Sequence, residues 1–418
     1  MGGFQDFLIL FSFLVEVAVL FYLERKAWHT IYTPLNFLML PYLFVLLITI
    51  AVSGSFGLVG FYYPSILIWS VGLLLFAIPS LAFASYSQKK PALSSFSLSP
   101  FDDDNLPPYL VYLGILLVLL FAYRLRQTIG SSEYFIGSDD FAEDFATFGF
   151  WGHLSRLCDV LLMLFIYYLS KERRWLWFLI IALVGVMVIR MVKGHMIIPC
   201  VVGVIMRLVS GKMRISGRFL TILLISAVAV FYLTYLLAYG IADGKEVTDD
   251  ILLFIFRHFV HYFTSGTLGF SLDMQVGLPD YGSVGIILSP FINILNHFTG
   301  NEEILSPVNP VFLYTGFNYT NVRTMFGTLF VHTTYMQFAA YVLCLSSICY
   351  LLKMFGTKYR SVLANLVYYY FCTLLAMGWF EFYFFHLDVL EIPAIILILK
   401  FIDVAMSVNR RSFAESVV

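Results

Sequence analysis

Several basic residues stand at the ends of long apolar runs, in patterns that suit the binding of an anion. Arg190 and Lys193 are three positions apart, and Arg257 and His261 are four apart, so each pair would share one helix face. Arginine binds phosphate through two parallel hydrogen bonds, and lysine supplies a point charge. We therefore expect Arg190, Lys193, Arg257 and Arg323 to bind a diphosphate. The alternative is that they extend to lipid phosphates.

Three histidines are candidates for the catalytic base of a group transfer, because imidazole ionises near neutral pH. His258 and His261 fall beside Arg257, in a segment rich in phenylalanine and tyrosine. His332 falls inside a later apolar run, next to two threonines. The alternative for each histidine is a hydrogen-bonded packing role without chemistry.

Carboxylates supply a third group of candidates. Arg156 precedes Asp159 by three positions, which predicts an ion pair that lowers the cost of two charges near lipid. The same two residues, together with Glu381, are candidates for binding a substrate sugar. Glu381, Asp388 and Glu391 fall in one short stretch, where each could accept a proton or pair with an arginine.

The sequence contains no zinc motif and no Gly-Lys-Ser phosphate loop, and its five cysteines all fall in apolar runs. We therefore expect no metal site, no other cofactor and no disulfide framework. The net charge is -1, so bulk charge does not favour nucleic acid as a partner.

Composition places these residues in a membrane protein. Of 418 residues, 60% are hydrophobic and 12% are charged, whereas soluble domains carry about 25% charged residues. Unbroken apolar runs have the length of membrane-spanning helices rather than of alternating barrel strands. We predict an all-α, polytopic integral membrane protein, a single transmembrane domain over 1–418. Its roughly eleven spans fall at 7–23, 35–53, 66–85, 108–123, 153–170, 175–191, 196–209, 219–241, 326–352, 362–384 and 388–405.

The distribution of lysine and arginine predicts the orientation. Short loops rich in these residues alternate with loops that lack them, which places the N-terminus outside and the C-terminus in the cytoplasm. Two outer segments are long: 124–152, and 242–325 with an interfacial helix at about 250–263. The candidate cations all fall on the outer side, where lysine and arginine are normally scarce. That placement favours anion binding.

Four short motifs, in this order and spacing over most of residues 120–340, resemble those of the O-antigen polymerase family. They are Phe150-Trp151-Gly152-His153-Leu154, Ile189-Arg190-Met191-Val192-Lys193-Gly194-His195, His261-Tyr262-Phe263-Thr264-Ser265-Gly266 and Asn321-Val322-Arg323-Thr324. The chain departs from the family in the following span, where many members have Asp-Phe-Gly and this sequence has Phe330-Val331-His332-Thr333-Thr334.

The resemblance implies a glycosyltransferase of polysaccharide or lipopolysaccharide biosynthesis in the bacterial inner membrane. Such an enzyme transfers a growing glycan from undecaprenyl diphosphate to a sugar hydroxyl of an incoming undecaprenyl-diphosphate-linked oligosaccharide on the periplasmic face. The resemblance also implies a GT-C-like helical architecture without a metal, and a chain-length regulator as a further partner. Two alternatives stay open, an O-antigen ligase and a transporter or flippase of lipid-linked oligosaccharides. The sugars and the linkage do not follow from the sequence.

Overall fold

The computed structural model describes residues 2–89, 105–131, 139–146, 149–190, 193–214, 216–237, 248–277, 284–306 and 308–416. Over these residues the chain is almost entirely helical, and its sheet is a single pair of two-residue strands. Seven helices of the described part are long and apolar enough to cross a membrane, and two shorter apolar helices, Leu176–Ile189 and Ile197–Val209, accompany them. The prediction of an all-α membrane protein is therefore confirmed.

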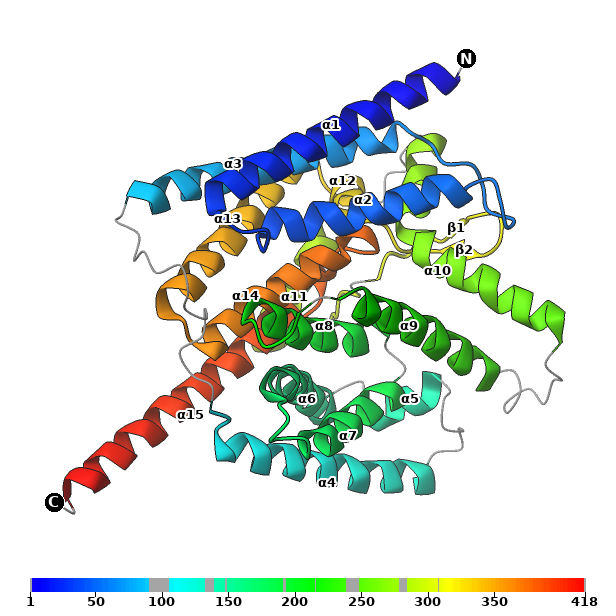
Figure 1. The fold of residues 1–418 in the computed structure, drawn as a ribbon. Helices are drawn as coiled ribbons and strands as arrows, with labels where there is room; N and C mark the ends of the chain where they lie inside the picture. Colours follow the sequence, from blue (N-terminus) through cyan, green and yellow to red (C-terminus); the bar gives the residue numbers. More distant parts are fainter. Residues whose placement is uncertain are drawn as a thin grey trace. The chain divides into compact units, whose positions relative to one another are not determined.

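Figure 1 labels the helices and strands in chain order. By the contacts among its residues, the chain divides into two compact units. Sequence patterning alone predicts one transmembrane domain and carries no sign of this division, because each unit draws on three separate stretches of chain. Unit 1 comprises Met1–Ser95, Ile215–Lys353 and Leu374–Leu387, and unit 2 comprises Phe96–Arg214, Met354–Thr373 and Asp388–Val418.

In the core of unit 1, aromatic side chains pack on one another, and backbone segments pass close to one another at glycines. Trp69 stacks on Tyr42 with ring centroids 3.4 Å apart and donates its indole N–H to the Thr324 hydroxyl at 2.9 Å. Gly266 packs so closely on the backbone of Phe380 that an added Cβ would clash with its carbonyl oxygen. The elements of unit 1 are α1 (Gly2–Trp28), α2 (Pro34–Val52), α3 (Ser65–Lys89), α9 (Gly217–Leu237), α10 (Asp249–Val276), α11 (Gly285–Thr299), β1 (Leu313–Tyr314), β2 (Tyr319–Thr320), α12 (Met325–His332), most of α13 (Tyr335–Tyr359), η2 (Met377–Trp379) and η3 (Tyr383–Phe385).

Local sequence explains both ends of α10. The Thr248 side chain accepts a hydrogen bond from the backbone N–H of Ile251, and two aspartates follow in the first turn, where the helix dipole favours negative charge. Gly277 ends the helix in the left-handed conformation, with φ of 94°. The helix is therefore longer than the interfacial helix predicted at about 250–263, because its second half packs on its neighbours through small residues.

Unit 2 is built around α6 (Gly149–Tyr168), most of whose second half is fully buried. α8 (Lys193–Val209) runs parallel to α6. Gly203 packs on Met163 and Ile166, and Arg207, one turn later on α8, binds the carbonyl of Leu169, nearly one turn after Ile166. The remaining helices of the unit are α4 (Pro108–Ser131), α5 (Asp139–Ala146), α7 (Leu176–Ile189), most of α14 (Val362–Ala376) and α15 (Asp388–Ser416).

The helices of unit 2 define two ends. We call the first the Arg190 end, where α7 finishes and where α6 and α15 begin. We call the second the Tyr168 end, where α6 finishes and α14 begins. α8 covers the region of the predicted short span at 196–209 and contains one of the two shorter apolar helices.

One predicted span differs from the structure. The apolar run at 326–352 is not one helix but two, α12 and α13, separated at Thr333, whose backbone is extended with φ of −136°. The Thr334 hydroxyl accepts from the Gln337 backbone N–H, and the Gln337 side chain accepts from the Thr334 backbone N–H, which is a reciprocal capping box. The Thr-x-x-Gln spacing in the sequence is the signal for this new helix start.

Candidate functional site

Six polar side chains gather at the Arg190 end of unit 2. Arg156 is central, because its Nη1 lies 3.2 Å from Asp159 Oδ2 and its Nε lies 2.7 Å from Asp388 Oδ1. His153 Nδ1 lies 2.7 Å from Glu391 Oε1. Arg190 lies within electrostatic range of Arg156, Asp159 and Asp388. We call this set the Arg190 cluster; its members are His153, Arg156, Asp159, Arg190, Asp388 and Glu391.

The helix termini explain why these residues meet. His153 and Arg156 belong to the first turns of α6, and Asp388 and Glu391 belong to the first turn of α15, where acidic side chains are favoured by the helix dipole. The Arg156–Asp388 ion pair joins the two helix starts. The predicted Arg156–Asp159 ion pair is present, and so is the expected alternative in which Asp388 is the partner of an arginine.

Arg190 leaves hydrogen-bonding capacity unused in this cluster. Its side chain is 2% exposed, and neither its Nε nor its Nη1 has a hydrogen-bond partner among the described residues. Asp159 Oδ1 is also buried without a hydrogen-bond partner in the same part of the chain. Buried polar atoms are nearly always paired, so unpaired donors and an unpaired acceptor in one cluster require an explanation. A polar ligand with both acceptor oxygens and O–H groups would satisfy both.

Arg323 occupies a different environment, in unit 1. Its side chain is 1% exposed and forms a buried ion pair with Asp273 of α10, including a 3.3 Å contact from Nη2 to Asp273 Oδ1. Because Asp273 holds its guanidinium inside the unit, Arg323 fits the predicted role of a diphosphate ligand poorly. His332 lies nearby, within electrostatic range of Arg323 and Asp273, and is 3% exposed.

The other two candidate bases lie on α10. His261 is 3% exposed, and its Nδ1 lies 3.0 Å from the Thr315 hydroxyl in the turn between β1 and β2. Burial lowers the pKa of His261, and its contact with this turn attaches the strand pair to α10. His258 is partly exposed and packs among aromatic rings, including those of Phe254 and Phe317.

Arg257 and His261 do not share an environment, although their spacing predicts one face. Arg257 is exposed, whereas His261 is buried against the β1–β2 turn. The spacing places two residues on the same side of a helix, but the β1–β2 turn covers His261 and leaves Arg257 exposed. Lys193, the remaining predicted diphosphate ligand, begins α8, and its side chain lies outside the described residues.

Glu381 lies in unit 1, between η2 and η3 and beyond the end of the α14 span. Burial raises the pKa of its carboxyl to about 7. Tyr383, two positions further on, lies within electrostatic range of this carboxyl and of Tyr262 on α10. The structure therefore gives Glu381 a different setting from Arg156 and Asp159, the two residues with which the sequence grouped it as a sugar ligand.

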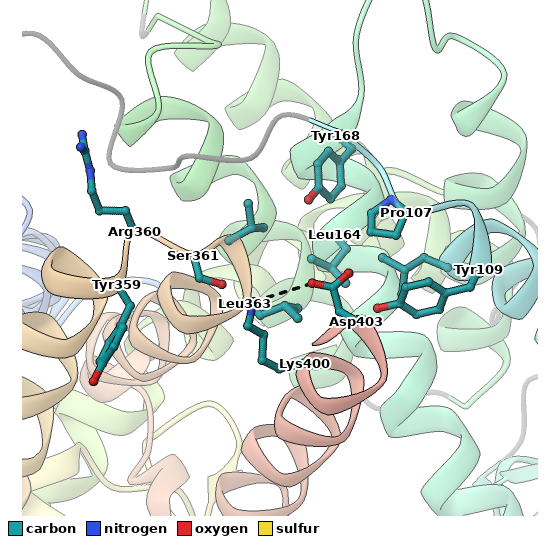
Figure 2. A pocket seen from close by; sticks show the side chains of 12 residues that line it. Pro107, Tyr109, Leu164, Tyr168, Tyr359, Arg360, Ser361, Leu363, Lys400 and Asp403 are labelled. Atoms are coloured by element: carbon teal, nitrogen blue, oxygen red, sulfur yellow. Dashed lines mark ion pairs between the residues drawn. The ribbon is translucent and has the colours of Figure 1, made fainter. Parts of the chain in front are cut away.

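A cavity of about 220 Å³ lies at the Tyr168 end of unit 2 (Figure 2). Tyr109, Leu164 and Tyr168 line it, and a Lys400–Asp403 ion pair of 3.7 Å stands beside them. Arg360 extends away from that pair in the figure. No residue predicted to bind substrate lines this cavity, so we place the candidate functional site at the Arg190 cluster.

The motifs that carry the resemblance fall into two groups, one in each unit. The first two motifs belong to α6 and to the α7–α8 region of unit 2. The last two belong to unit 1, on α10 and at the start of α12. Sequence reasoning missed Glu391 as the partner of His153. The one sequence feature that pointed to Glu391 is its position three residues after Asp388, which puts both carboxylates in the first turn of one helix.

Comparison with known proteins assigns the chain to a family whose function is unknown. No curated protein and no solved structure matches the chain. A family model matches residues 57–409, which include every residue of the Arg190 cluster. The chain therefore belongs to the family of unknown function DUF6337.

Proposed function

We propose that this membrane protein is a glycosyltransferase that polymerises lipid-linked oligosaccharide repeat units. It would transfer the growing glycan from undecaprenyl diphosphate to a sugar hydroxyl of an incoming lipid-linked unit, on the periplasmic face of the bacterial inner membrane. The proposal includes eleven spans, a GT-C-like architecture, an outer N-terminus and a cytoplasmic C-terminus. The resemblance of the four motifs to the O-antigen polymerase family supports it.

One observation carries the proposal: the Arg190 cluster contains buried hydrogen-bond donors and an acceptor that have no partner among the described residues. The donors are Nε and Nη1 of Arg190, and the acceptor is Oδ1 of Asp159. A sugar diphosphate has phosphate oxygens that accept from arginine and hydroxyl groups that donate to a carboxylate. The structure thus brings a predicted diphosphate ligand, Arg190, close to predicted sugar ligands, Arg156 and Asp159.

The chemistry suits a leaving group that gains negative charge. As the bond between the donor sugar and the diphosphate breaks, the diphosphate takes the electron pair. A guanidinium that is already in position stabilises that charge without a metal, and removal of one such donor typically costs about 100- to 1000-fold in rate. Arg156 holds Asp159 and Asp388 in place, so its charge is already balanced within the protein.

Substitution of Arg190 tests the assignment directly. We expect Arg190→Ala to lose about 100- to 1000-fold of polymerisation per folded protein. Arg190→Lys should recover only part of it, because lysine keeps the charge but loses the bidentate geometry. Arg207→Lys is the matched control, since Arg207 is an arginine of the same unit whose guanidinium binds backbone carbonyls at the other end. Normal glycan length from Arg190→Ala at normal membrane level would overturn the assignment.

A deletion strain separates the polymerase from its alternatives. We expect loss of long chains while single repeat units are still attached to their acceptor. Loss of all attached units would contradict a polymerase and indicate a ligase or a flippase. Accumulation of lipid-linked polymer in the periplasm would then identify the ligase.

A further inference from the structure

A histidine–carboxylate pair stands at the edge of the Arg190 cluster. His153 Nδ1 lies 2.7 Å from Glu391 Oε1, and the two side chains are 64% and 16% exposed. An ionised carboxylate can only accept hydrogen bonds, so Glu391 binds the tautomer of His153 that carries its proton on Nδ1. That tautomer leaves Nε2 with a lone pair. Nε2 has no hydrogen bond to any other described side chain.

The neighbouring Arg156–Asp388 ion pair holds the His153–Glu391 pair in position. Glu391 lies one helical turn after Asp388, and Asp388 binds Arg156, which lies nearly one turn after His153 on α6. The starts of α6 and α15 are therefore joined by two neighbouring contacts, Arg156–Asp388 and His153–Glu391. A nucleophile–base site needs this arrangement, in which a third group orients an accessible imidazole.

We propose that His153 is the general base that activates the acceptor hydroxyl, and that Glu391 is its positioning residue. The proposal rests on the proposed polymerase function and adds to it the group that accepts the proton. His153 differs from the three histidines that the sequence favours, because His261 and His332 are both 3% exposed and only His258 of the three is partly exposed.

The acceptor sugar hydroxyl gives its proton to His153 Nε2, while its oxygen forms a bond to the anomeric carbon of the donor sugar. The bond from that carbon to the diphosphate oxygen breaks, and the diphosphate leaves with the electron pair beside Arg190. His153 then returns the proton to water, which restores the neutral imidazole for the next transfer.

A structural role makes different predictions and must be distinguished. If the His153–Glu391 contact only joins α6 to α15, its loss should lower thermal stability and leave turnover per folded protein unchanged. A base should behave in the opposite way. Lys400→Gln is the matched control on α15, because it breaks the exposed ion pair with Asp403 at the other end of unit 2.

The experiment uses the full-length protein in detergent or liposomes, with a purified undecaprenyl-diphosphate-linked repeat unit. We expect His153→Ala to lower turnover roughly 100- to 10,000-fold, with donor binding and melting temperature close to those of the wild type. Added imidazole should restore part of the activity of His153→Ala but not that of Arg190→Ala. Glu391→Gln should lose roughly 10- to 100-fold, since the amide no longer favours the active tautomer.

Each outcome decides one of the two proposals. Turnover of His153→Ala within threefold of the wild type would overturn the base assignment while polymerisation by the wild type still supports the polymerase. Loss of activity together with stability, and without rescue by imidazole, would show a structural contact and would also overturn it. Absence of polymerisation by the wild type, with glycan loss of the ligase or flippase kind in the deletion strain, would instead overturn the proposed function.

Discussion

Arg323 and Arg190 are both almost fully buried, at 1% and 2% exposure, but their guanidinium groups are satisfied differently. Both carboxylate oxygens of Asp273 bind Arg323, whereas two nitrogens of Arg190 have no hydrogen-bond partner among the described residues. In the sequence the two residues look alike, since each is an arginine at the end of an apolar run. Their partners, which are distant along the chain, make the first structural and the second a candidate ligand.

The Arg323–Asp273 pair should be important for stability. Removal of one partner leaves a buried unpaired charge, so we expect Asp273→Leu to lower the free energy of unfolding by about 3–5 kcal/mol. Arg323→Met combined with Asp273→Leu should recover much of that loss, because no buried charge is left unpaired. Thermal unfolding in detergent, followed by intrinsic fluorescence, checks both. A melting temperature of Asp273→Leu equal to that of the wild type would contradict the expectation.

Glu381 predicts a dependence of stability on pH. Its folded pKa of about 7 lies above its ordinary value, so the folded state holds the proton more tightly than the unfolded state. This contribution is complete below the unfolded pKa of about 4.5 and is lost as pH rises through about 7. We expect the unfolding free energy to fall by no more than about 3 kcal/mol between about pH 4.5 and pH 7 and to level off above that, with the melting temperature following it.

Glu381→Gln should make that part of the pH profile flatter and raise the melting temperature at pH 8. Glu302→Gln is the control, because Glu302 is an exposed glutamate of the same unit. Equal pH profiles for wild type and Glu381→Gln would show that this carboxyl ionises in the folded protein as it does in water.

At the scale of elements, α6 runs from the Arg190 cluster to the Tyr168 end and packs in parallel on α8. The two helices approach at Gly203, where an added Cβ would lie 2.7 Å from Ile166 Cβ and 3.0 Å from the Met163 carbonyl oxygen. The close approach leaves no room for a side chain, so this glycine is required for packing. The sequence shows only a glycine within an apolar run.

Gly203→Val should therefore force α8 away from α6. We expect a loss of about 1–3 kcal/mol of stability from overpacking, measured by thermal unfolding in detergent. Gly185→Val, on α7 of the same unit, is the matched control, because an added Cβ there meets nothing within 4 Å. Similar melting temperatures for the two valine variants would show that α6 and α8 are not held together at Gly203.

The sequence also contains local patterns that set where helices begin and end, but these patterns are less conspicuous than the apolar runs. The run at 326–352 has the length of one span, yet the Thr334–Gln337 capping box starts a new helix within it. Conversely, α10 extends well beyond its predicted end, because the small residues from Thr264 to Ser271 allow close packing on other backbone segments. Hydrophobicity alone reports neither effect.

At the scale of the whole molecule, the two ends of unit 2 provide a test of orientation. Phe150 lies in the first turn of α6, at the Arg190 end, and is 68% exposed; Ser361 lines the cavity at the Tyr168 end. The predicted topology places the first outside and the second in the cytoplasm. In a background without the five native cysteines, we expect an impermeant thiol reagent to label Phe150→Cys in intact spheroplasts.

Ser361→Cys should react with the same reagent only after permeabilisation. The reverse pattern would invert the orientation and place the Arg190 cluster in the cytoplasm. Labelling of both positions in intact spheroplasts would show that the two ends of α6 are not separated by a membrane.

The class of the protein and the approximate positions of most of its long apolar helices follow from the amino-acid sequence alone. Apolar runs of spanning length have few alternatives to helix in lipid, because every backbone polar group must be satisfied within the segment. The sequence also determined the Arg156–Asp159 pair, since residues three apart on a helix are neighbours.

Which charged groups meet across the chain follows only from how the helices pack. His153 and Glu391 are 238 positions apart, and no periodicity relates them. Their contact depends on the packing of α15 against α6, which is set by side chains along both helices rather than by the two residues themselves. For the same reason, only the structure separates Arg323, which is ion-paired, from Arg190, which has unused donors: a buried charge takes its role from the partners that the fold brings to it.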